Sequence, residues 1–192
     1  MRFLTNFADL GLVLPLAVLV ALSLAAVGRR RDALAWSLAV TGTLGAMLAL
    51  KVSVFILPGQ TAPWGLTNPS GHTAAGVVVY AGLLVLVGER FAPRVPIALL
   101  AGAAFGLLFG YTRLALRVHS LPDVLVGGAV GLAGALVLAR LAGPRRPGAP
   151  AYGHAVVAVI ALLGMLILHG HRLHAEAALR SLAAEVRSVG EP

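Results

Sequence analysis

Long apolar stretches separated by short polar segments dominate the pattern of this chain. Most of the stretches approach the roughly 20 residues that an α-helix needs to cross the hydrocarbon core of a bilayer. The pattern therefore predicts an all-α fold, a polytopic membrane helix bundle with about six transmembrane helices. The expected spans are residues 10–28, 33–57, 72–88, 96–111, 122–141 and 152–169, of which the third and fourth are short.

The composition supports a single membrane domain. Hydrophobic residues make up 59% of the chain and charged residues 11%, which is less charge than the surface of a soluble domain needs. We expect this domain to cover residues 1–171, followed by a C-terminal tail, residues 172–192, that is amphipathic or disordered. Small residues at helical spacing predict close helix packing. They are Gly102, Gly106, Gly110, Gly127 and Gly131.

The arginines predict the orientation of the bundle. Loops 28–32, 88–95 and 140–150 fall on one side and together carry eight arginines. The loops on the other side carry Arg2, Arg113 and Arg117, and loop 58–69 there has no charge. Loops rich in arginine stay in the cytoplasm. The opposite side would then face the outside, which in a bacterium is the periplasm. A five-span arrangement, which would put the tail inside, stays open.

The formal net charge of +8 is read as this topology signal. Without interleaved aromatic residues or a nucleic-acid motif, no nucleic-acid partner is expected. The absence of cysteine from the sequence excludes disulfides, thiolate metal sites and a cysteine nucleophile.

Two short polar motifs interrupt the apolar pattern on the outer side. The first is Pro-Ser-Gly-His at residues 69–72, and the second spaces Arg113, His119 and Asp123 by five and three residues. Two predicted spans separate the motifs, so the chain returns the second to the side of the first. Two histidines, an arginine, a serine and a carboxylate at one membrane face suit phosphoryl transfer.

The first motif lies at the start of the third predicted span. Free N–H groups at a helix start attract phosphate. Gly71 would let an anion approach the backbone, and Ser70 could donate a further hydrogen bond. His72 is placed to protonate a leaving oxygen. The alternative is that Ser70 is an ordinary helix cap.

The second motif and a preceding lysine supply the other candidate groups. Arg113 offers a planar fork of donors for phosphate oxygens. If Asp123 holds one imidazole nitrogen of His119, the other is free to attack. Lys51 lies near the end of an apolar run, where it must snorkel or meet an anion. The alternatives are interfacial cations and a His–Asp pair that only satisfies two polar groups.

Together these residues resemble the type 2 phosphatidic acid phosphatase family, within the acid phosphatase and vanadium haloperoxidase superfamily. The pattern of that family is K-x6-R-P, P-S-G-H and S-R-x5-H-x3-D. The second part matches in full, and the third matches with Thr112 in place of serine. In the first part Lys51 is present, but Pro58 stands where the arginine is expected. The resemblance covers about residues 45–140.

The resemblance implies a covalent, metal-independent mechanism without a cofactor. His119 would attack phosphorus and form a phosphohistidine, Asp123 would orient it, and His72 would protonate the departing oxygen. The substrate would be a lipid phosphate or diphosphate, such as phosphatidate, phosphatidylglycerol phosphate, an isoprenyl diphosphate or a lipid A phosphate. The implied phosphate-binding residues are Lys51, Ser70, Gly71 and Arg113.

The arginine missing at Pro58 leaves alternatives open. Another donor, from Gln60, Thr61 or Trp64, could replace it. The chain could instead be a catalytically inert lipid-binding or scaffold member, or a phosphotransferase that uses the same site. A transporter is disfavoured because the polar residues gather at one interface rather than line a path.

A second group of polar residues follows the last predicted span. It consists of His169, His171 and His174. This spacing does not put three imidazoles on one helix face, so no metal site is expected. We expect a polar collar where the span ends.

Overall fold

The computed structural model describes residues 1–56, 64–89, 91–144 and 152–171. All regular structure in these ranges is helical, as the sequence predicts. A short helix, α1 (Arg2–Asn6), comes first. The six predicted spans are all helices, namely α2 (Leu10–Ala26), α3 (Arg30–Ile56), α5 (Gly71–Gly88), α6 (Arg94–Ala115), α7 (Leu121–Ala142) and α8 (Tyr152–Leu168).

Four of the described helices are at least 18 residues long and apolar enough to cross a membrane. They are α3, α5, α6 and α7. The helices α2 and α8 are also apolar but have 17 residues each. A helix of 17 residues is about 25 Å long, slightly less than the roughly 30 Å of a hydrocarbon core.

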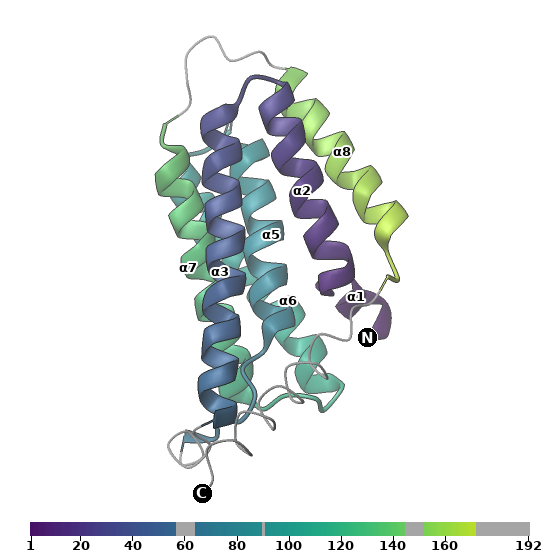
Figure 1. The fold of residues 1–192 in the computed structure, drawn as a ribbon, viewed down its shortest axis with the longest axis vertical. Coiled ribbons are helices and arrows are strands. Elements are labelled where there is room, and N and C mark those ends of the chain that lie inside the picture. The colour runs from purple at the N-terminus through teal and green to yellow at the C-terminus, as the bar shows by residue number, and fades with distance from the viewer. Residues whose placement is uncertain (57–63, 90, 145–151, 172–192) are drawn as a thin grey trace, which may run out of the picture.

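Helix α5 is the central element of an up-and-down bundle (Figure 1). In its most apolar window 72% of the residues are buried, against 33% in α3 and α6 and 39% in α7. Helices α3, α6 and α7 pack around it, and α2 pairs with α8 beside them. The start of α5, the end of α6 and helix α1 all lie at one end of the bundle. The residues of both motifs therefore lie at that end.

The fourth predicted span is longer than expected. Helix α6 begins at Arg94 and ends at Ala115, beyond the predicted 96–111 at both ends. The hydropathy pattern missed these turns because they contain two arginines, Arg94 and Arg113, which the fold buries with hydrogen-bond partners. The predicted loop 28–32 is also shorter, because α3 begins at Arg30.

Two glycines of α7 bring this helix against α5. A Cβ atom at Gly127 would collide with the carbonyl oxygen of Ser70, and one at Gly131 would lie 2.7 Å from that of Ala74. Both contacts are closer than real Cβ atoms make, so only glycine fits without a shift. The predicted close packing is confirmed here, and Gly127 holds α7 directly against the first motif.

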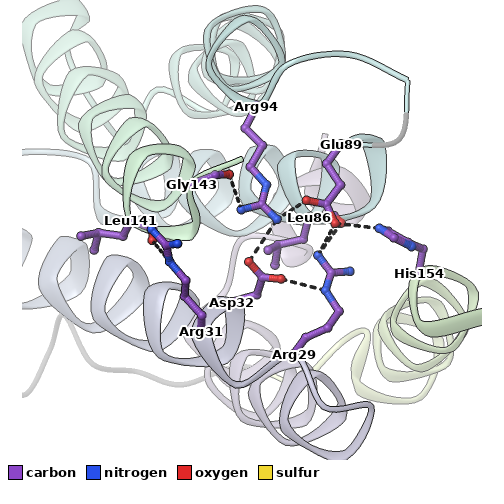
Figure 2. A network of polar contacts seen from close by, with 9 residues as sticks. All are labelled: Arg29, Arg31, Asp32, Leu86, Glu89, Arg94, Leu141, Gly143 and His154. Carbon is purple, nitrogen blue, oxygen red and sulfur yellow. Dashed lines mark hydrogen bonds and ion pairs between the residues drawn. The ribbon is translucent and has the colours of Figure 1, made fainter. Parts of the chain in front are cut away.

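A network of buried charges occupies the opposite end of the bundle (Figure 2). The carboxylate of Glu89, at the end of α5, accepts from Arg29 at 2.7 Å and also from Arg94. The His154 Nε2 atom lies 2.7 Å from the same carboxylate. Asp32 completes the network, 2.8 Å from Arg29 and 3.0 Å from Arg94. Helices α3, α5, α6 and α8 are thereby joined through charged side chains.

Candidate active site

The carboxylate of Asp123 organises the loop that precedes the first motif. Its Oδ1 atom accepts the backbone N–H groups of Thr67 at 3.1 Å and Asn68 at 2.8 Å. Its Oδ2 atom accepts the N–H of Ser120 at 3.0 Å, and the Ser120 hydroxyl caps α7 in return. One residue of the second motif therefore sets the path of the chain that leads into the first.

Helix α7 begins as its sequence predicts. Ser120 and Asp123 form a reciprocal capping box, and Pro122 lies in the first turn. The Ser120 hydroxyl also donates to the carbonyl of Gly65 at 3.0 Å. The loop is thus attached to the start of α7 at two points.

The backbone of the same loop orients the ring of His119. The His119 Nδ1 atom lies 2.8 Å from the carbonyl oxygen of Asn68, and 3.8 Å from the Oδ2 atom of Asp123. Because a carbonyl oxygen can only accept, this hydrogen bond puts the proton on Nδ1 and leaves the lone pair on Nε2. The sequence predicted that Asp123 would hold the imidazole directly. In the structure His119 Nδ1 donates to the Asn68 carbonyl, whose position Asp123 fixes, while Asp123 itself stays within ion-pair distance of the ring.

Lys51 enters this site from the last part of α3. Its side chain is buried, its Nζ atom donates to the Oδ1 atom of Asn68 at 2.7 Å, and it lies over the ring of Phe55. A Cβ atom at Gly71 would lie 3.4 Å from the Cε atom of Lys51. The lysine therefore packs beside the start of α5 instead of reaching for water.

Ser70 is the N-cap of α5. Its hydroxyl accepts the N–H of Thr73 at 3.3 Å and pairs with the Thr73 hydroxyl at 2.9 Å. Its own N–H donates to the carbonyl of Asp123 at 3.0 Å. The predicted cap role is thus observed, and Ser70 is fully buried. The cap uses the Ser70 hydroxyl as an acceptor, so its proton stays available to a ligand when Thr73 is the donor in the hydroxyl pair.

His72 and Arg113 contact a different part of the chain. The Nε2 atom of His72 lies 3.5 Å from the Oδ2 atom of Asp9, which caps α2. The buried guanidinium of Arg113 donates to the hydroxyl of Thr5 in α1 at 2.9 Å. The structure therefore brings five predicted site residues into one set of contacts. It connects the other two, His72 and Arg113, to the N-terminal segment. The five are Lys51, Ser70, Gly71, His119 and Asp123.

The chain turns tightly between the end of α6 at Ala115 and the start of α7 at Leu121. Arg117 adopts a left-handed conformation there, with φ of 53°. The N–H of Val118 donates back to the carbonyl of Arg113 at 3.2 Å. A helix end of this kind reverses the chain within a few residues, which places His119 beside the loop that carries Asn68.

Three residues of this site were missed in the sequence. Asn68 contacts Lys51 through its side chain, and His119 and Asp123 through its backbone. The sequence feature that could have identified Asn68 is its position directly before the Pro-Ser-Gly-His motif. Thr5 and Asp9 gave a weaker signal, because polar residues at the start of a first span are common.

Several other predicted residues lie apart from the site. Trp64 is 79% exposed, while Pro58, Gln60 and Thr61 fall outside the described residues. The ring of His169 packs at a tilt against the rings of Phe3 and Phe7. His174 is also outside the described ranges, as is the tail 172–192. Within those ranges no group of three or more His, Asp or Glu side chains could hold a metal.

This arrangement suits nucleophilic attack by an imidazole. The buried His119 ring, 1% exposed, carries its lone pair on Nε2. Lys51 provides a positive charge nearby, and His72 stands in the first turn of α5 as a second imidazole. Such a set can attack an electrophile that carries negative charge, stabilise that charge and protonate a leaving group.

Comparisons with known proteins agree with the motifs. The family model described as PAP2 superfamily matches residues 33–147. An uncharacterized 22.5 kDa protein in the cps region of Klebsiella pneumoniae is 27% identical over 169 residues, which cover 82% of this chain and 77% of that protein. No solved structure gives a significant match.

Proposed function

Since the chain belongs to the PAP2 superfamily, we propose that it is an integral membrane phosphatase that hydrolyses a lipid phosphate or diphosphate through a phosphohistidine. The observation that carries this proposal is the hydrogen bond from the Nδ1 atom of His119 to the Asn68 carbonyl. It leaves Nε2 with a lone pair, as an attacking nitrogen requires.

The reaction has two steps. In the first, Nε2 of His119 attacks the terminal phosphorus, an N–P bond forms, and the P–O bond to the leaving group breaks, which is the lipid alcohol of a monoester or the lipid phosphate of a diphosphate. His72 gives its proton to the departing oxygen. In the second, His72 takes a proton from water, the water oxygen attacks phosphorus, and the N–P bond breaks to release phosphate and restore His119. No redox partner is needed for either step.

The binding of the phosphoryl group is assigned to cations and to the helix start. Lys51 lies beside Gly71, and Arg113 is buried in the last turn of α6 at the same end of the bundle. The first turn of α5 adds its backbone dipole. Charges fixed in a poorly hydrated site stabilise the transition state without rearranging.

The active site is assigned to the non-cytoplasmic face. The arginine-rich end of the described helices carries Arg29, Arg30, Arg31, Arg94 and Arg140. The end with the candidate site carries Arg2, Arg113 and Arg117 among its described residues, together with Lys51. This asymmetry supports a cytoplasmic location for the first end, so the site would meet lipid headgroups of the outer leaflet, the periplasmic leaflet if the host is bacterial.

The test is phosphate release by the purified protein in detergent with EDTA present. The panel contains phosphatidate, phosphatidylglycerol phosphate and an isoprenyl diphosphate, with His119→Ala as the control. We expect metal-independent release that this variant lacks, and a phosphorylated protein that is labile in acid and stable in alkali. Release that survives in His119→Ala would refute the proposed nucleophile.

Two alternatives remain outcomes of the same experiment. Pro58 in place of the family arginine supports a catalytically inert lipid-binding member, which would bind these lipids without releasing phosphate. A phosphotransferase would give a phosphorylated alcohol when an alcohol acceptor is added. The ratio of that product to free phosphate separates transfer from hydrolysis.

A further inference from the structure

The N-terminal segment, residues 1–9, lies outside the region that matches the family yet packs at the candidate site. The match begins at residue 33, whereas Thr5, Ala8 and Asp9 are all buried. Helix α1 lies at the same end of the bundle as the start of α5 and the end of α6 (Figure 1). Two of these buried residues, Thr5 and Asp9, are polar and need partners, so the segment does more than cover an apolar surface.

Three polar contacts attach the segment to the two helices that carry His72 and Arg113. The Thr5 hydroxyl accepts from Arg113 at 2.9 Å. The Phe7 carbonyl accepts from the hydroxyl of Tyr80, on α5, at 2.6 Å. The third contact is the Asp9 carboxylate, 3.5 Å from the Nε2 atom of His72. Each contact connects residues more than 60 positions apart, so the tertiary fold itself holds the segment here.

The two oxygens of Asp9 have separate roles. Oδ1 accepts the N–H of Gly11 at 2.9 Å and caps α2, which fixes the side chain. Oδ2 faces the Nε2 atom of His72. The imidazole is 28% exposed, while the carboxylate beside it is 9% exposed, so a buried anion lies behind a partly accessible ring.

We propose that Asp9 is the positioning residue for His72, an inference that rests on the proposed function. A carboxylate behind an imidazole holds the ring in one orientation and stabilises its protonated form. With Nε2 against Asp9, the Nδ1 atom is the nitrogen that gives the proton to the departing oxygen. Asp9 thus acts on the reaction through His72 and does not touch the substrate.

This role also predicts a substrate dependence. Protonation matters most when the departing oxygen is strongly basic, as in the alkoxide of a lipid phosphomonoester. Protonation matters little for a nitrophenolate. It also matters less than for an alkoxide when a lipid phosphate departs from a diphosphate. Asp9 should therefore favour turnover of lipid phosphomonoesters over diphosphates.

The test compares an alkyl phosphomonoester with a 4-nitrophenyl phosphomonoester in wild type, Asp9→Asn, His72→Ala and the double variant. Asparagine keeps an oxygen that can cap α2 while the charge is lost. We expect Asp9→Asn to lower kcat for the alkyl ester by about 10- to 100-fold, less than the roughly 10²- to 10⁴-fold that a general acid itself contributes, and to change the nitrophenyl rate less than about threefold. In the His72→Ala background it should have no further effect.

Other outcomes separate this inference from the function on which it rests. If Asp9→Asn slows both esters equally, or adds its full loss to His72→Ala, Asp9 is only structural and the inference is wrong. Asp9→Ser keeps a cap and removes the carboxylate, so it should repeat the Asn result if the charge matters. A folded wild type that releases phosphate from neither ester and not from an isoprenyl diphosphate would instead overturn the proposed function, and this inference with it. Release from the diphosphate alone would leave the proposed function standing and overturn this inference, because Asp9 is argued to serve phosphomonoesters.

Discussion

The two ends of the bundle use carboxylates for different purposes. At the candidate site, Asp123 accepts three backbone N–H groups and shapes a loop. At the opposite end, Glu89 is shared by Arg29, Arg94 and His154 and joins separate helices (Figure 2). A carboxylate that binds backbone determines where one segment lies, whereas one that binds side chains determines how helices pack. The first should matter more for activity and the second more for stability.

Carboxylates are few in this chain, which makes the difference between the two ends clearer. The described ranges contain four Asp and Glu side chains, with Asp9 and Asp123 at the site and Asp32 and Glu89 at the other end. In a membrane bundle each buried charge is expensive and needs a partner. Every one of these four carboxylates has partners in the structure. Removing any of them should therefore have a measurable and local effect.

Removal of one histidine from each end should give the largest contrast. His119→Ala deletes the attacking nitrogen, so phosphate release should fall by about 10⁴-fold or more. His154→Ala deletes a partner of Glu89 and should leave kcat within about threefold of wild type, because it touches no group of the site. Phosphate release in detergent measures both. Comparable losses in the two variants would show that the ends are not independent.

For stability, replacing one carboxylate at each end should have the larger effect at the end opposite the candidate site. Glu89→Gln leaves two buried arginines short of a charge and should lower the free energy of unfolding by about 3–5 kcal/mol. Asp123→Asn loses part of three backbone hydrogen bonds, which costs about 1–3 kcal/mol. The measurement is thermal unfolding in detergent.

The same pair should differ in the opposite sense in activity. In Asp123→Asn the loop no longer holds the Asn68 carbonyl against His119, and turnover should fall by about 10²–10⁴-fold, the order seen when a buried histidine loses its orienting group. Folded Glu89→Gln should keep its turnover. An Asp123→Asn protein with wild-type turnover would remove the loop from the mechanism.

A pair of glycines provides the smallest and most local test. A Cβ at Gly127 would meet the Ser70 carbonyl, so Gly127→Ala should cost about 1–3 kcal/mol of stability and lower turnover. Gly45, in α3, has open space around it. There an alanine should leave turnover unchanged and stabilise the helix by up to about 1 kcal/mol. Equal effects of the two variants would show that the α5–α7 contact does not position the motif.

Much of the fold could be predicted from the sequence because lipid restricts the options. Every backbone polar group in a span must bond within its own helix, so six apolar stretches imply helices with little ambiguity. The boundaries were less predictable. Arg94 and Arg113 read as loop residues, yet both lie inside α6, because tertiary partners compensate the burial of their charges.

The candidate site was predictable in its residue types and less so in its bonding. The spacing of His119 and Asp123 indicated a direct pair, whereas the hydrogen bond of His119 goes to the Asn68 carbonyl. A backbone carbonyl carries no side-chain signal. Thr5 and Asp9 were missed for another reason, because their partners are more than 60 positions away and only the packing of α1 brings them together.

The central position of α5 has a mechanical consequence. The helix carries His72 in its first turn and has Glu89 as its C-cap, and 18 residues of α-helix span about 27 Å. Neighbours surround it along this length, so it can neither slide nor rotate unless they move with it. Helix α5 is therefore held along its length by its neighbours and at its far end by the charge network around Glu89. We therefore expect any movement that admits a ligand to occur in the loop of residues 64–70 and the N-terminal segment, and not in α5.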